Sequence, residues 1–151
     1  MNNIILSHKT ALYVIRKLRS ENNIKSILVF VEEIIHSRKN HGNQNLEILV
    51  NSHNKKHNNW RFNYHVLVNK LPHNSMLKLT DEISVVCPEL LLIQLSRFMP
   101  LEILCVIALE FCGTYSISPD TGDFVSNIKP ITNVNKIKDY VNKFSRNNNN
   151  A

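Results

Sequence analysis

The first residues that suggest chemistry lie in the stretch SVVCPELL (residues 84–91), where a β-branched run ends and a leucine-rich helix pattern begins. A thiol at a helix N-terminus can have a lowered pKa, because the helix dipole and the free backbone N–H groups favour the thiolate. Cys87 therefore meets one condition for a nucleophile. Glu89 opposes thiolate formation, however, and no adjacent signature points to a histidine that would activate the sulfur. We therefore favour a structural strand-to-helix joint over a catalytic cysteine.

The other two cysteines suggest packing rather than chemistry. Cys105 and Cys112 are seven residues apart in a segment that is apolar on nearly every side, so we expect them to be small core residues. The three cysteines form no C-x-x-C pair, and no hydrophobic signal peptide precedes them. Free thiols in a reducing cytoplasm are the expected state.

Seven histidines raise the question of a metal site. His53 and His57 are four residues apart, and His36 and His41 are five apart. Zinc takes three or four ligands held on rigid elements, whereas the first pair lies in the polar stretch NSHNKKHNN (residues 51–59). The chain also contains no dinucleotide, P-loop, zincin or nucleophile-elbow motif. We therefore predict no cofactor, no metal and no enzymatic activity.

A basic and aromatic segment, NKKHNNWRF (residues 54–62), is the candidate contact surface. Its basic members are Lys55, Lys56, His57 and Arg61. Cations interleaved with Trp60 and Phe62 are typical of nucleic-acid surfaces, and the formal net charge of +6 permits such a partner. The alternative is a solvated loop whose two aromatic side chains turn into the core of the sheet, and we favour this alternative.

Helical periodicity predicts two helices in the first part of the chain. In residues 5–20, Ser7 is placed as the N-cap and Leu6 as a hydrophobic staple onto Ala11. A second helix is expected in residues 26–39, although ILVFV within it would also suit a strand.

The period then changes to two in residues 46–50, 60–68 and 77–86, which predicts a small antiparallel sheet of about three to four strands. Beyond the sheet, Pro88 suits the first turn of a helix that runs through Arg97, and Pro100 can open another that ends at Gly113. Because residues 101–112 are apolar all round, we expect this helix to be central and buried.

The C-terminal part is expected to hold one turn, one helix and a tail. SPDTGD (residues 118–123) has turn composition. Behind Thr132, a closing helix would place Val134, Ile137, Val141 and Phe144 on one face. The asparagine-rich residues 146–151 are expected to be disordered.

Together these elements predict a single α+β domain over residues 1–145, with a helical part (1–40), a sheet (44–86) and a helical half (88–145). The most apolar segment, residues 101–111, is too short to cross a bilayer and carries Glu102 and Glu110. We therefore expect no membrane partner.

The order of these motifs resembles a module of AbiEi-type antitoxin proteins, whose relatives often carry a very-short-patch-repair-like endonuclease domain after it. The resemblance covers about residues 5–143 and rests on LSHKTAL, on LEILV, on the long segment from FNYHVLV to FCGTY, and on PITNVNKIKDYV. The residues that match the shared pattern are His65, Leu71, Pro72, Val85, Val86, Pro88, Glu89, Gly113, Thr114 and Tyr115. At Cys87 the related proteins have Ser or Thr, which is the better N-cap.

The resemblance implies a binding role without catalysis. No segment after the final helix offers the metal-binding acidic set of the nuclease half, and the first 40 residues are too short for an additional winged helix-turn-helix. We therefore expect a non-enzymatic module in a toxin–antitoxin or defence setting, with a toxin or a separate nuclease chain as protein partner. The alternatives are a basic DNA-binding accessory module and a truncated remnant of an endonuclease-family protein.

Overall fold

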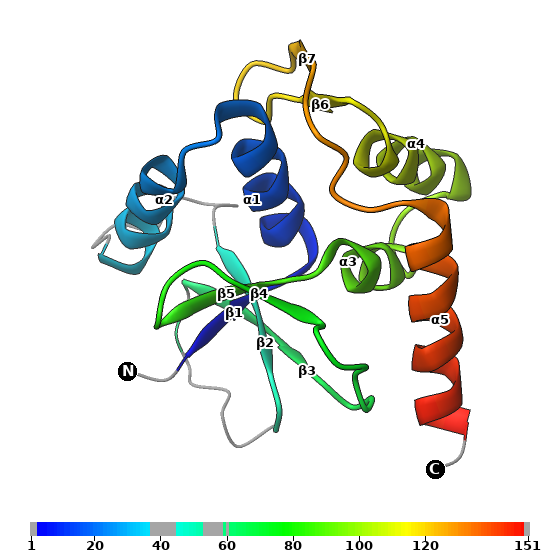
Figure 1. Cartoon of the computed structure of the whole chain (residues 1–151). Coiled ribbons are helices and arrows are strands. Elements are labelled where there is room, and N and C mark those ends of the chain that lie inside the picture. The colour runs from blue at the N-terminus through cyan, green and yellow to red at the C-terminus, as the bar shows by residue number, and fades with distance from the viewer. Residues whose placement is uncertain (1–2, 37–44, 53–58, 60, 150–151) are drawn as a thin grey trace.

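The computed structural model describes residues 3–36, 45–52, 59 and 61–149. The elements are β1 (Ile4–Leu6), α1 (His8–Glu21), α2 (Ile24–His36), β2 (Leu46–Val50), β3 (Phe62–Val66), β4 (Met76–Lys78), β5 (Ile83–Val86), α3 (Pro88–Leu95), α4 (Leu101–Cys112), β6 (Tyr115–Ile117), β7 (Phe124–Ser126) and α5 (Val134–Asn149). Helices α1, α2 and α3 lie on one side of the main sheet, and α5 runs beside α3 at its flank (Figure 1). The predicted α+β class is confirmed.

The main sheet has five strands in the order β3-β2-β1-β5-β4. Strand β1 lies at its centre, antiparallel to β2 and parallel to β5, and β2 is parallel to β3. The prediction of an antiparallel sheet is therefore wrong, since the sheet is mixed. One reason is β1, whose three residues are too short to show a period of two and which pairs parallel with β5. The other is the parallel β2–β3 pair, because a period of two does not distinguish parallel from antiparallel strands.

Residues 77–86 form a hairpin, not one strand. Thr80 turns the chain because its hydroxyl oxygen accepts hydrogen bonds from the backbone N–H groups of Glu82 (3.2 Å) and Ile83 (3.0 Å). Strands β4 and β5 on either side of this turn are antiparallel. A threonine oxygen that binds the backbone two and three residues on is an ordinary turn device.

The core lies between the sheet and the helices above it. Its fully buried apolar side chains include Leu6, Val14, Ile15, Val31, Val85 and Leu91. Each such side chain contributes about 1.5–3 kcal/mol when it leaves water. Because these residues come from β1, α1, α2, β5 and α3, their burial joins three helices and the centre of the main sheet around one core.

Helix α4 is the main departure from the expected packing. Leu101 is 70% exposed, Leu109 65%, Ile103 50% and Val106 48%, and Cys105 is also exposed. The prediction of a central buried helix, with Cys105 in the core, is therefore wrong. A helix that is apolar all round can bury any of its faces, and α4 buries only the side that carries Ile107, Glu110 and Phe111.

The C-terminal helix also differs from its prediction. Helix α5 continues to Asn149, so residues 146–149 are helical and not disordered. Asn148 stabilises this end, because its side chain accepts from Lys70 N–H (2.9 Å) and donates to Lys70 C=O (3.2 Å). Residues 150–151 lie outside the described residues.

The face that α5 turns to the core is the predicted one only in part. Tyr140 is buried, and Ile137 and Phe144 pack on the core, whereas Val134 (57%) and Val141 (40%) are exposed. The predicted turn at 118–123 is confirmed, and it joins the short strands β6 and β7.

Candidate functional site

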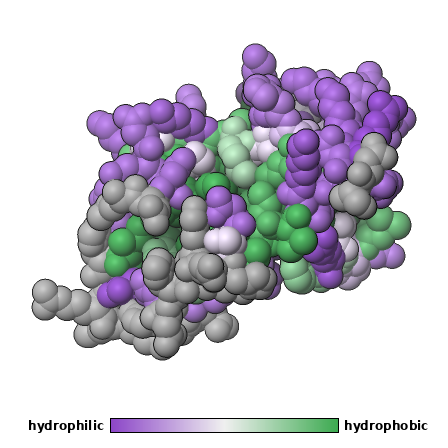
Figure 2. Space-filling model, turned by 90° about the horizontal axis from the view of Figure 1, so that it is seen from below, coloured by the Kyte–Doolittle hydropathy of each residue, from purple (hydrophilic) through white to green (hydrophobic). Residues whose placement is uncertain are grey.

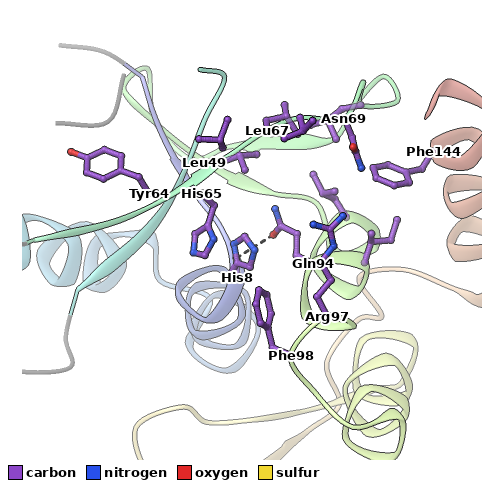
Figure 3. A pocket seen from close by; sticks show the side chains of 15 residues that line it. His8, Leu49, Tyr64, His65, Leu67, Asn69, Gln94, Arg97, Phe98 and Phe144 are labelled. Atoms are coloured by element: carbon purple, nitrogen blue, oxygen red, sulfur yellow. Dashed lines mark hydrogen bonds between the residues drawn. The ribbon is translucent and has the colours of Figure 1, made fainter. Parts of the chain in front are cut away.

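A cavity of about 520 Å³ lies between the main sheet and the helices. It is lined by His8, Leu49, Tyr64, His65, Val66, Leu67, Val68, Asn69, Leu71, Leu90, Ile93, Gln94, Arg97, Phe98 and Phe144. These residues come from the start of α1, from β2, from β3 and the segment after it, from α3 and its exit, and from α5 (Figure 3). Seen from below the main sheet, apolar side chains gather in the middle of the surface and hydrophilic ones border them (Figure 2).

The start of α1 is fixed at this cavity by two side chains from other elements. His8 N–H donates to Gln94 Oε1 (3.2 Å), and Lys9 N–H donates to Glu47 Oε2 (2.5 Å). The first N–H groups of a helix have no partner within it, so Gln94 and Glu47 take the role that a capping side chain has elsewhere. Ser7 occupies the N-cap position but makes no side-chain cap; its hydroxyl is 3.0 Å from His8 Nδ1.

His8 is stacked on His65. Their ring centroids are 3.6 Å apart with 22° between the planes, and Phe98 meets His8 edge-on at 5.5 Å. The pKa of His8 is lowered to about 4, mainly by burial and in addition by His65 and Arg97, while Glu47 opposes them. The His8 ring is therefore uncharged at neutral pH.

Glu47 lies close to the histidine pair. Burial raises the pKa of this carboxyl, but the interactions with His65, with the Lys9 N–H and with His8 outweigh burial, so its pKa is lowered on balance. His65 Nε2 is buried and 3.7 Å from Glu47 Oε1, which is longer than a hydrogen bond. The site thus has an ionised carboxylate close to two stacked imidazoles.

Cys87 has the environment of a structural residue. It is the N-cap of α3, and its Sγ accepts from the Leu90 N–H at 3.5 Å, as predicted for a weak cap. Burial, with a smaller contribution from Glu89, raises the pKa of the thiol to about 12. The sulfur therefore stays protonated at neutral pH, which removes the main reason to consider it a nucleophile.

Several residues of the resemblance gather around the same helix start. Pro88 occupies the first turn of α3, and Glu89 accepts a short hydrogen bond from the Thr132 hydroxyl. Ser75 donates to the Pro72 carbonyl (2.6 Å), and its hydroxyl is 2.5 Å from that of Tyr140. These contacts tie the segment before β4 and the start of α3 to α5.

Gly113 and Tyr115 lie elsewhere, at the end of α4 and in β6. A Cβ on Gly113 would be 2.9 Å from the Tyr115 ring and 3.0 Å from the Leu109 carbonyl oxygen, so this close approach explains the glycine. His65 is separate from both groups and lines the cavity. The matching residues thus belong to three places in the fold.

The basic segment is only partly placed. Lys55, Lys56, His57 and Trp60 lie outside the described residues. Arg61 precedes β3, and its backbone N–H donates to the Asn59 side chain at 3.1 Å. The contact surface expected there stays a prediction.

Sequence reasoning missed most of the cavity. The end of α3 contributes Gln94, Arg97 and Phe98. Its apolar pattern predicts a helix but does not show which other elements pack opposite these residues. His8 carried a signal, since a histidine directly after a helix N-cap position is close to free backbone N–H groups. Its partner His65 comes from β3, 57 residues later in the chain, and periodicity does not reveal such a pairing.

The comparisons with known proteins give no relative: no protein-family model, no curated protein and no solved structure matches this chain. Across the part of the chain that the structure describes, no helix has the length and apolar run that a membrane crossing requires. Within the same residues, no three His, Cys, Asp or Glu side chains converge as metal ligands.

Proposed function

We propose that this chain is a non-enzymatic binding module that recognises a protein partner through the exposed face of α4, in the toxin–antitoxin or defence setting that the AbiEi resemblance implies. The observation that carries the proposal is the exposure of apolar side chains along α4. Large apolar patches on soluble domains mark interaction sites.

Three of the exposed side chains form a row. Leu101, Cys105 and Leu109 follow one another at a spacing of four residues, so they lie in a row along the helix. Val106 flanks this row, and Glu102 is the charged residue among the exposed positions of α4. Such a row suits insertion of a helix into an apolar groove of a partner.

Charge favours a different protein as the occupant over a second copy. The chain carries a formal net charge of +6, so two copies repel one another at long range, whereas an acidic protein is attracted. The expected partner is therefore an acidic protein with an apolar groove. A toxin or a separate nuclease chain of this character would fit.

The test is co-expression of the chain with the products of adjacent reading frames, followed by sedimentation analysis of the purified mixture. We expect a complex that Leu109→Asp abolishes. Val29→Asp is the matched control, because Val29 is a 51% exposed apolar residue on another helix, α2. A complex that survives Leu109→Asp, or the lack of any complex with an acidic neighbour product, would contradict the proposal.

A nucleic-acid partner is the second candidate, and α5 supports it. The exposed cations of this helix are Lys136, Lys138, Lys143 and Arg146, against the single acidic residue Asp139. Cations on one exposed helix can contact phosphates, and such binding weakens steeply as salt rises. A titration of duplex DNA at several salt concentrations separates the candidates, because a flat salt response would remove the second one.

A further inference from the structure

The cavity beside the His8–His65 stack is distinct from the α4 face used above. Its wall comes from β2, β3, α3, α5 and the start of α1, and no residue of α4 lines it. Its volume, about 520 Å³, falls in the range of small-molecule sites, which is about 300–1,000 Å³.

Hydrogen-bond donors without acceptors point into this cavity. Because Gln94 Oε1 accepts from the His8 N–H, the other end of the amide is its NH₂ group, whose nitrogen has no acceptor among the described residues. Figure 3 shows the side chains of Gln94, Arg97 and Asn69 directed into the same space. Arg97 likewise forms no ion pair with a carboxylate in the described part of the chain.

The charge of the wall is positive. Among the described residues that line the cavity, Arg97 is the one Lys or Arg, and none is Asp or Glu. The N-terminus of α1 adjoins it at His8, but the Glu47 carboxylate already binds the Lys9 N–H there, so the attraction for an anion comes from Arg97 and not from the helix dipole. A single guanidinium matches one negative charge, and its fork fits the two oxygens of a carboxylate.

The rest of the wall is apolar. Leu67, Leu71, Ile93 and Phe144 are partly buried against the core and face the cavity. A ligand that only accepted hydrogen bonds from the donors would leave these apolar side chains in contact with water. The cavity therefore fits a molecule with an apolar body as well as an anionic group.

We propose that this cavity binds a small organic carboxylate with an aromatic or aliphatic body. The carboxylate meets Arg97 and the Gln94 amide nitrogen, and the body lies against Leu67, Leu71 and Phe144.

The test is a titration of the full chain with 2-naphthoate, followed by fluorescence and by amide NMR shifts. We expect saturable binding, with shifts centred on His8, His65 and Gln94. The neutral analogue 2-naphthamide should bind at least about tenfold more weakly, because it lacks the charge that Arg97 attracts. Equal affinity for the two probes, or no saturable binding at millimolar 2-naphthoate, would overturn the proposal.

Two cavity variants and one control complete the test. Arg97→Gln and Gln94→Glu should each weaken 2-naphthoate about tenfold or more; Gln94→Glu keeps an oxygen to accept from the His8 N–H but replaces the donor. Arg146→Gln removes the same charge from an exposed site outside the cavity wall and should leave binding unchanged. Equal losses in Arg97→Gln and Arg146→Gln would show general charge attraction and overturn the assigned site.

Discussion

Cys87 shows how its surroundings set the role of a reactive residue. The sulfur has the helix-terminus position that activates thiols in many enzymes, yet burial raises its pKa to about 12. Burial disfavours the charged thiolate, and this effect on the pKa is larger than the stabilisation of the thiolate by the helix dipole. The position of Cys87 was predictable from the sequence, but its burial depended on α5 and on the segment before β4, which the sequence did not bring together.

We expect Cys87→Ser to leave function intact and to hold or raise the free energy of unfolding by up to about 1 kcal/mol, because a hydroxyl caps a helix better than sulfur does. Urea denaturation measures the change. In a parallel thiol-labelling experiment at neutral pH, the exposed Cys105 should react much faster than the buried Cys87. Fast labelling of Cys87 in the native protein, or loss of function in a folded Cys87→Ser chain, would revive the nucleophile.

His8 gives a prediction about pH. Its folded-state pKa of about 4 lies below the ordinary value of 6.5. Between these two pH values, the His8 side chain is protonated in the unfolded chain and uncharged in the folded chain. The free energy of unfolding should therefore fall as pH drops from about 6.5 to about 4, by up to about 3 kcal/mol from this residue. His65, Glu47 and Arg97 are the charged or titratable groups that act on it.

The variant His8→Asn should flatten this part of the stability curve, measured by urea denaturation at several pH values. Asn suits the backbone, since His8 has a φ of 49° and Asn tolerates positive φ. The control is His73→Asn at an exposed position, which should keep the wild-type slope. An unchanged slope in His8→Asn would contradict the assignment.

At the scale of elements, most helices were predictable, whereas the sheet was only partly so. Helices α1, α3 and α4 have long patterns and clear ends, and the predicted stop at Gly113 is the C-cap of α4. Strand β1 has three residues, so no period could show it, and it pairs parallel with β5. The parallel pairing of β2 with β3 was not predictable either, because a period of two is the same for parallel and antiparallel strands. Short strands gain their structure from neighbours, and single-sequence patterns contain little of that information.

Glu110 links α4 to α1 and β6. From the sequence, its charge indicated only that residues 101–111 do not cross a membrane. It is fully buried in α4, accepts hydrogen bonds from Arg16 of α1 (2.7 Å) and from the Ser116 hydroxyl of β6 (3.0 Å), and its backbone carbonyl accepts from Arg19 (2.8 Å). A buried carboxylate with these partners fixes how α4 docks on α1.

We expect Glu110→Ala to lower the free energy of unfolding by about 3 kcal/mol, because Arg16 then loses its buried partner. Glu102→Ala, at an exposed site on the same helix, should change it by less than about 0.5 kcal/mol. Thermal and urea unfolding of both variants provide the comparison. Similar small effects in the two variants would mean that the α1–α4 contact does not depend on the ion pair.

At the scale of the molecule, α4 lies at the surface because other helices already cover the main sheet. The main sheet is covered by α1, α2 and α3, and the core residues of these elements leave α4 at the periphery, where it contacts α3 and β6 (Figure 1). Composition shows that a helix is apolar, but only the complete packing shows which apolar helix is left outside. This is why residues 101–112 were expected at the centre and lie at the surface.

The surface position of α4 predicts that its outer residues can be made polar without loss of the fold. Leu101→Glu combined with Leu109→Glu should change the free energy of unfolding by less than about 1 kcal/mol, because both side chains are mostly exposed. Ile107→Ala on the inner face, where the side chain is 2% exposed, should cost about 2–5 kcal/mol. Urea denaturation measures both. If the double Glu variant unfolds as readily as Ile107→Ala, the outer face of α4 is part of the core, and the protein-binding role proposed for it loses its basis.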